Sequence, residues 1–133
     1  IKTLGLSHKF YFLGSHPPES MPEYFAAADA LLITLKKADI FSYTIPGKLQ
    51  SYLACGKPII GALDGIGKQI IEVSNSGLCV DAEDVVGLSE NIIKMNKIPP
   101  KELLNFGNNG LDYFNNHFNK EKLLNDFEAI LKG

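Results

Sequence analysis

A proline, a glycine and a lysine stand together at Pro46, Gly47 and Lys48, directly before a run of helix-forming residues. A helix that begins here turns its first free backbone N–H groups outward, and such groups bind phosphate. Pro46 fixes the backbone at the helix start and carries no N–H of its own. Gly47 lets a ligand approach the backbone closely, and Lys48 adds a positive charge. These residues suit a diphosphate, although chemistry alone equally allows a plain helix start with a solvated lysine.

A second glycine-rich stretch, GIGK at 65–68, shares only part of the pattern of a phosphate-binding loop. A P-loop has four residues between its glycines and a Ser or Thr after its lysine, whereas Gln69 stands in that place here. We therefore exclude a site for a nucleoside triphosphate. The stretch can still contact a phosphate or a sugar, as the start of a second helix.

The hydrophobic pattern predicts an alternation of strands and helices that would position both stretches. Continuous apolar runs, typical of buried parallel strands, lie at 9–13, 30–35, 58–63 and 78–80. Helices are expected at 20–30, 47–55, 68–76, 82–96, 100–117 and 119–132. This order predicts an α/β fold, a Rossmann-like parallel sheet flanked by helices, with further helices at the C-terminal end.

The predicted sheet also indicates where a ligand would bind. Ligands of open parallel sheets lie outside the carboxyl ends of the strands, where strand-to-helix loops converge. Three loops meet this condition, at 14–20, 36–46 and 61–67. At the end of the first loop, Ser20 is expected to cap a helix, with Glu23 as its capping-box partner.

Composition narrows the function classes. The 133 residues carry a formal net charge of −2, so we expect one domain over 1–133 and no nucleic-acid partner. Apolar runs all fall short of the roughly 18 residues that a membrane span requires, so no segment is expected to span a membrane, and we expect a cytoplasmic protein. Cys55 and Cys79 lie apart from the histidines, without metal-ligand spacing, so no metal site is expected, and two free cysteines in apolar surroundings fit a reducing cytosol.

Four segments, in their order and spacing, resemble one known family. FLG, MPEYFAAADALLITL, IPGKLQSYLACGKPII and DGIGKQIIEVSNSGLCVDAED are similar to the C-terminal half of retaining group 1 (family 4) glycosyltransferases, which are two-domain enzymes of GT-B fold. The similarity covers about 9–95. The form KLxxYLAxGKPI is typical of members that build bacterial surface polysaccharides, such as the O-antigen of lipopolysaccharide and capsule. The resemblance implies an N-terminally truncated half of a GT-B fold, with the acceptor-binding N-terminal domain absent and no transfer by this part alone.

The resemblance also implies a site for a nucleoside diphosphate sugar, with a UDP-sugar favoured and no cofactor. The implied donor-binding residues are Gly14, Ser15, Tyr43, Thr44, Gly47, Lys48, Ser51, Gly65 and Gly67. Many family members carry two glutamates separated by seven residues, and Tyr43 and Ser51 stand in these places here. Serine can bond a ribose hydroxyl, but without the charge that strengthens such a bond about twofold. Catalytic residues stay unknown.

The implied partners are the nucleotide-sugar donor and a glycan or lipid-linked acceptor, which the absent domain would bind. That domain would also hold the enzyme peripherally on the inner face of the cytoplasmic membrane. A sheet edge left uncovered predicts self-association. Three other interpretations remain open. They are a nucleotide-sugar epimerase or hydrolase of the same fold, a non-catalytic Rossmann-like signalling or binding module, and a domain that has lost donor binding.

Overall fold

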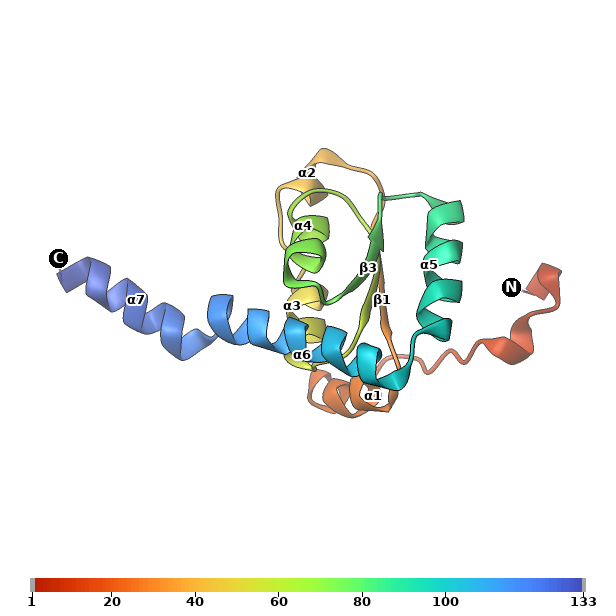
Figure 1. The fold of residues 1–133 in the computed structure, drawn as a ribbon, viewed down its shortest axis with the longest axis horizontal. Coiled ribbons are helices and arrows are strands. Elements are labelled where there is room, and N and C mark those ends of the chain that lie inside the picture. Colours follow the sequence, from red (N-terminus) through yellow and green to blue (C-terminus); the bar gives the residue numbers. More distant parts are fainter. Residues whose placement is uncertain (1, 133) are drawn as a thin grey trace.

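The computed structural model describes residues 2–132, in which three parallel strands form a sheet between two layers of helices (Figure 1). The strands are β1 (Leu31–Thr34), β2 (Ile59–Ala62) and β3 (Gly77–Val80). They lie side by side in the order β1-β2-β3, with Leu31 opposite Ile59 and Ile59 opposite Gly77. The α/β fold with a parallel sheet flanked by helices, expected from the sequence, is therefore confirmed.

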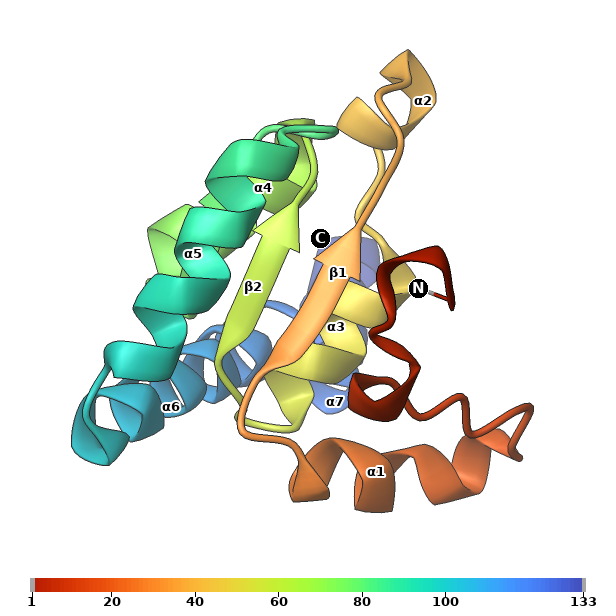
Figure 2. The ribbon, with the colours of Figure 1, turned by 90° about the vertical axis from the view of Figure 1, so that its right-hand side faces the viewer.

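Helices cover both faces of the sheet and continue beyond it (Figures 1 and 2). On one side lie α3 (Gly47–Ala54), α4 (Gly65–Ser74) and α6 (Pro100–His117), and on the other lies α5 (Val85–Lys97). The short α2 (Asp39–Ser42) lies beyond the carboxyl end of β1, α1 (Met21–Ala27) lies near its amino end, and α7 (Lys120–Lys132) extends away from the body. The 3-10 turns are Lys2–Leu4, Ser7–Lys9 and Pro18–Ser20.

The core lies between the sheet and the α3–α4 layer. Leu49 and Leu53 of α3, Leu63 after β2 and Ile71 of α4 are each 0% exposed. Burial of each such side chain stabilises the fold by about 1.5–3 kcal/mol. The layer of α3 and α4 is therefore held firmly against the strands, and the starts of both helices are placed with it.

The predicted strand at 9–13 does not form. Among the described residues, this segment has no ladder partner, and the side chains of Phe10, Tyr11, Phe12 and Leu13 are 48%, 83%, 83% and 61% exposed. A strand needs a neighbour for its backbone groups, and an apolar run alone does not supply one. The strand prediction was therefore wrong for this segment.

Two helix starts also differ from expectation. The side chain of Ser20 does not cap α1, because its backbone is already helical (φ −86°, ψ −12°) and its hydroxyl donates to the carbonyl of Pro17 at 2.8 Å. The helix α4 begins at Gly65, three residues before the predicted start, so the loop predicted at 61–67 is shorter than expected and GIGK forms the first turn of the helix. The other predicted helices and strands are confirmed to within three residues, whereas the segment 36–46, which was expected to be a loop, contains the short helix α2.

Candidate functional site

Loops and helix starts converge at the carboxyl edge of the sheet (Figure 2). There, β1 leads through α2 to the start of α3, and β2 leads through Leu63 and Asp64 to the start of α4. Two of the three loops expected to bind a ligand therefore meet at this edge, as parallel strands require.

A cavity of about 270 Å³ lies between the end of β1 and the start of α3. It is lined by Leu32, Ile33, Thr34, Leu35, Pro46, Gly47 and Lys48. The N–H groups of Gly47 and Lys48 belong to the first turn of α3, where no helix carbonyl precedes them to accept a bond. These N–H groups and the helix dipole favour an anion at this end, and the ammonium of Lys48 adds to that preference.

The start of α4 packs against the loop that leads into α3. Gly65 has φ +66°, and a Cβ on it would lie 2.1 Å from the carbonyl oxygen of Ser42. A Cβ on the buried Gly67 would lie 2.5 Å from Leu63 and 3.3 Å from the ring of Pro46. The approach of Gly65 to the backbone of Ser42 requires glycine, whereas at Gly67 a Cβ would have to displace a methyl group of Leu63. These contacts hold the start of α4 against the loop that leads into α3.

Three of the remaining candidate residues lie on the same loop and helix. The side chain of Tyr43 is 79% exposed. Thr44 donates its hydroxyl to the carbonyl of Ile40 at 3.0 Å, within the loop. Ser51 is exposed one turn into α3, and its hydroxyl donates to the carbonyl of Gly47 over a long 3.3 Å. Tyr43, Thr44 and Ser51 are thus carried by the unit that contains Gly47.

Gly14 and Ser15 are not brought to this edge. They precede the turn Pro18–Ser20 and α1, which lie near the amino end of β1, whereas α2 lies beyond its carboxyl end (Figure 2). Gly14 has φ +79°, a Cβ at this position would have no atom of residues 2–132 within 4 Å, and Ser15 is exposed. Their separation from the other candidates follows from the absence of the strand at 9–13.

Ionic and polar contacts around the carboxyl edge were not anticipated from the sequence. Lys68 of α4 donates to Asp81 at 2.5 Å and lies 3.8 Å from Glu72. The hydrogen bond raises the pKa of Lys68 and lowers the pKa of Asp81. The charge of Lys68 is therefore held by two carboxylates, while Lys48 lines the cavity. Lys68 and Asp81 are 13 residues apart in the sequence, a separation that no helical or strand periodicity predicts.

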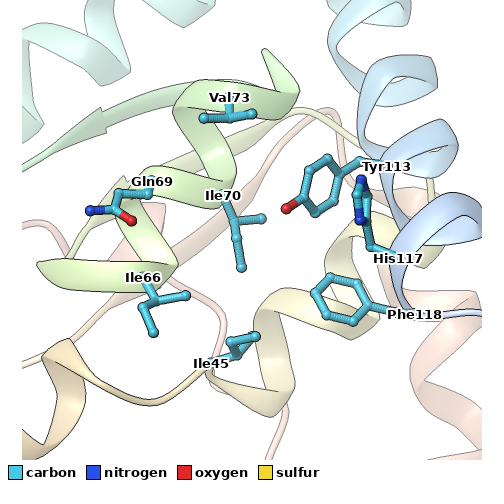
Figure 3. A pocket seen from close by; sticks show the side chains of 8 residues that line it. All are labelled: Ile45, Ile66, Gln69, Ile70, Val73, Tyr113, His117 and Phe118. Atoms are coloured by element: carbon cyan, nitrogen blue, oxygen red, sulfur yellow. The ribbon is translucent and has the colours of Figure 1, made fainter. Parts of the chain in front are cut away.

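A second and larger cavity, of about 390 Å³, lies between α4 and the end of α6 (Figure 3). Its lining is Ile45, Ile66, Gln69, Ile70, Val73, Tyr113, His117 and Phe118. The rings of Tyr113 and His117 lie 4.2 Å apart between centroids on its α6 side. Ile45 lines this cavity and its neighbour Pro46 lines the first, so the loop that leads into α3 contributes to both.

Neither metal ligands nor a membrane span is found in the part of the chain that the structure describes. Within residues 2–132, no three His, Cys, Asp or Glu side chains are grouped as metal ligands. Over the same residues, every helix is too short or too polar to cross a bilayer. Cys55 and Cys79 are free thiols, and burial raises the pKa of both, that of Cys79 to about 11.

Comparison with known proteins identifies the family. The sequence model described as "Glycosyl transferases group 1" matches residues 1–97. The N-acetyl-alpha-D-glucosaminyl L-malate synthase of Bacillus anthracis is 26% identical over 131 residues, which cover 98% of this chain and 32% of that protein. The chain thus spans about a third of the length of this relative. Because the family match covers most of the sequence and agrees with the parallel α/β fold, the chain belongs to the group 1 glycosyl transferases.

Proposed function

We propose that this chain is the donor-binding part of a glycosyltransferase, which moves a sugar from a nucleoside diphosphate sugar to a glycan or lipid-linked acceptor. The observation that carries the proposal is the cavity between β1 and α3, with Gly47 and Lys48 in its lining. Family membership supports the reaction class, and the free N–H groups of a helix start support binding of a diphosphate.

The chemistry of transfer explains why such a site is useful. A departing nucleoside diphosphate gains negative charge in the transition state, and fixed donors that face it lower the barrier. The N–H groups of Gly47 and Lys48 and the Lys48 ammonium would supply this stabilisation. Ser51 would turn its weakly bonded hydroxyl toward the ribose, and Tyr43 and Thr44 would lie near the sugar.

The finer assignments are also proposals. We favour a UDP-sugar as donor and bacterial surface polysaccharides as the products, with the acceptor domain holding the enzyme at the membrane surface. The name of the Bacillus anthracis relative describes an N-acetylglucosaminyl group joined to L-malate, so UDP-N-acetylglucosamine is the first sugar nucleotide to test. A base-binding role for Gly14 and Ser15 would require their segment to reach the carboxyl edge.

An amide-shift titration of the isotope-labelled chain with UDP, GDP, UDP-N-acetylglucosamine and inorganic phosphate tests the proposal. We expect shifts at Gly47, Lys48 and Ser51 with one nucleoside diphosphate, at lower concentrations than with phosphate. Shifts at Gly14 with the same nucleotide would support its role at the base. Shifts that gather instead around Tyr113 and His117, in the second cavity, would contradict the placement of the donor.

A further inference from the structure

One carboxylate joins the loop between β1 and α3 to the turn that follows β3. The loop 36–46 leaves β1 and leads into α3. Near its beginning, the N–H of Lys37 donates to Oε1 of Glu83 at 3.1 Å, across 46 residues of sequence. Residues 36–45 are all described by the structure, and this is the one hydrogen bond that links them to another part of the chain.

The backbone of Glu83 is in a conformation that its residue type disfavours. Its φ is +69°, in the left-handed region that glycine adopts freely and side chains with a Cβ rarely adopt. The N–H of Val85 donates to the carbonyl of Glu83 at 2.9 Å and holds the turn in this shape. Glycine would fit this turn without strain, so the presence of a glutamate calls for a contribution from its side chain. The contact that the side chain makes is the hydrogen bond with the N–H of Lys37.

The same turn, 81–84, also holds the start of α4. The N–H of Ala82 donates to Oδ1 of Asp64 at 3.0 Å, and Asp81 accepts from Lys68. The far end of the loop 36–46 in turn rests on α4, where the backbone of Ser42 lies against Gly65. The turn is therefore bonded directly to the beginning of the loop and, through α4, supports its end.

We propose that Glu83 is a positioning residue, whose carboxylate holds the loop 36–46 against the turn 81–84 and thereby sets Gly47 and Lys48 in place for a donor diphosphate. The first part, that Glu83 holds the loop, follows from the hydrogen bond to Lys37. The consequence for the donor rests on the proposed function, so the two parts need separate measurements.

The first measurement is amide hydrogen exchange in the wild-type chain, Glu83→Gly, Glu83→Gln and the control Asn75→Gly. Asn75 also has positive φ, at 49°, but it ends α4, where glycine is favoured. In Glu83→Gly we expect exchange at Lys37 and the loop to rise about 10-fold, because the local bond is lost. Relief of strain should meanwhile keep the unfolding temperature unchanged or raise it.

The two comparison variants separate positioning from strain. Glu83→Gln keeps an acceptor oxygen and should restore much of the protection at Lys37. Asn75→Gly should relieve strain without changing exchange at Lys37. Unchanged exchange in Glu83→Gly would overturn the proposal. Faster exchange throughout the chain, with a lower unfolding temperature, would also overturn it, because Glu83 would then act on global stability.

The second measurement is the dissociation constant of UDP for the same variants. We expect Glu83→Gly to weaken UDP binding several-fold, with recovery in Glu83→Gln and no change in Asn75→Gly. A looser loop with unchanged UDP affinity would refute the positioning of the donor residues. If the wild-type chain failed to bind nucleotide, the proposed function would fail, while the exchange data would still decide whether Glu83 holds the loop.

Discussion

Substitution of the lysines at the two ends of α3 should change the stability of the free chain in opposite directions. Only the substitution at the start of the helix should weaken the binding of a ligand. Lys48 lies in the first turn of α3, and Lys57 follows its last turn after the Gly56 break. A cation near a helix start opposes the helix dipole, whereas a cation near the end complements it. When an anion is bound at the helix start, the charge of Lys48 becomes favourable, because it attracts the anion. We therefore compare Lys48→Ala with Lys57→Ala.

In the free chain, the expected changes are small but differ in sign. The dipole effect on an exposed charge is at least about 0.3 kcal/mol, and we take about 0.3–0.5 kcal/mol for each lysine. Unfolding entropy of about 2.1 cal/mol/K per residue gives about 280 cal/mol/K for 133 residues. Lys48→Ala should therefore raise the unfolding temperature by about 1–2 °C, and Lys57→Ala should lower it by a similar amount.

In the presence of UDP, the two variants should separate clearly. A hydrogen bond to a charged group contributes about 1.5–3 kcal/mol, which corresponds to a dissociation constant about 10- to 150-fold higher when the bond is lost. We expect this loss for Lys48→Ala and no loss for Lys57→Ala, measured by calorimetry at low salt. For the two variants without ligand, the difference in unfolding temperature should disappear in 1 M NaCl, because the Debye length falls to about 3 Å.

Two outcomes would refute this reasoning. Equal UDP affinity in Lys48→Ala and wild type would mean that Lys48 does not face the diphosphate. A lower unfolding temperature in free Lys48→Ala would mean that the Lys48 side chain stabilises the fold through contacts stronger than the dipole effect.

Three further predictions concern the surroundings of the site. Gly65→Ala should destabilise the chain by about 1–3 kcal/mol in urea unfolding, because of the positive φ and the contact with Ser42, whereas Gly47→Ala, with open space around its Cβ position, should be near neutral. The ion pair of Lys68 and Asp81 should stabilise the fold at pH values between about 3.8 and 10.5. The pKa of Asp81 is lowered in the fold, so its contribution is present above about pH 3.8 and is lost as the pH falls further. The pKa of Lys68 is raised, so its contribution is present below about pH 10.5 and is lost as the pH rises further. Asp81→Asn should therefore lower the urea midpoint at pH 7 and match wild type near pH 2, and a deficit unchanged at pH 2 would contradict this. A thiol reagent at pH 8 should modify Cys55 before Cys79, whose pKa of about 11 reflects its burial, and Cys55→Ser should remove the fast phase.

The sequence predicts elements well where the signal is local. The β1 and β2 segments are continuous apolar runs, and α3 lies between proline at its start and Cys-Gly-Lys-Pro at its end, so their positions followed from composition and from helix stop signals. The strand predicted at 9–13 failed because a strand depends on a neighbour that composition does not reveal. Gly65 and Gly67 were placed in the loop 61–67 before a helix predicted at 68–76, whereas they belong to the first turn of α4, and Gly65 lies against the backbone of Ser42, which is distant in sequence.

The candidate site was predictable in its location but not in its support. Parallel strands alone place Gly47 and Lys48 at the carboxyl edge. The bond from Lys37 to Glu83 and the bond from Lys68 to Asp81 join residues 46 and 13 positions apart, and they depend on how the loops pack. Such long-range contacts carry no periodic signal, so they emerge only from the structure.

The proposed donor site relies on the backbone more than on side chains, and this changes what mutation should reveal. Ser51 offers only a neutral hydroxyl, so the diphosphate would be bound mainly by the N–H groups of Gly47 and Lys48. Side-chain substitutions cannot remove those donors, and Lys48→Ala should therefore retain part of the affinity. Substitutions that displace the loop act on the donors themselves. Gly65 and Glu83, which contact the loop rather than the cavity, should then affect nucleotide binding in the same way as a residue of the cavity lining.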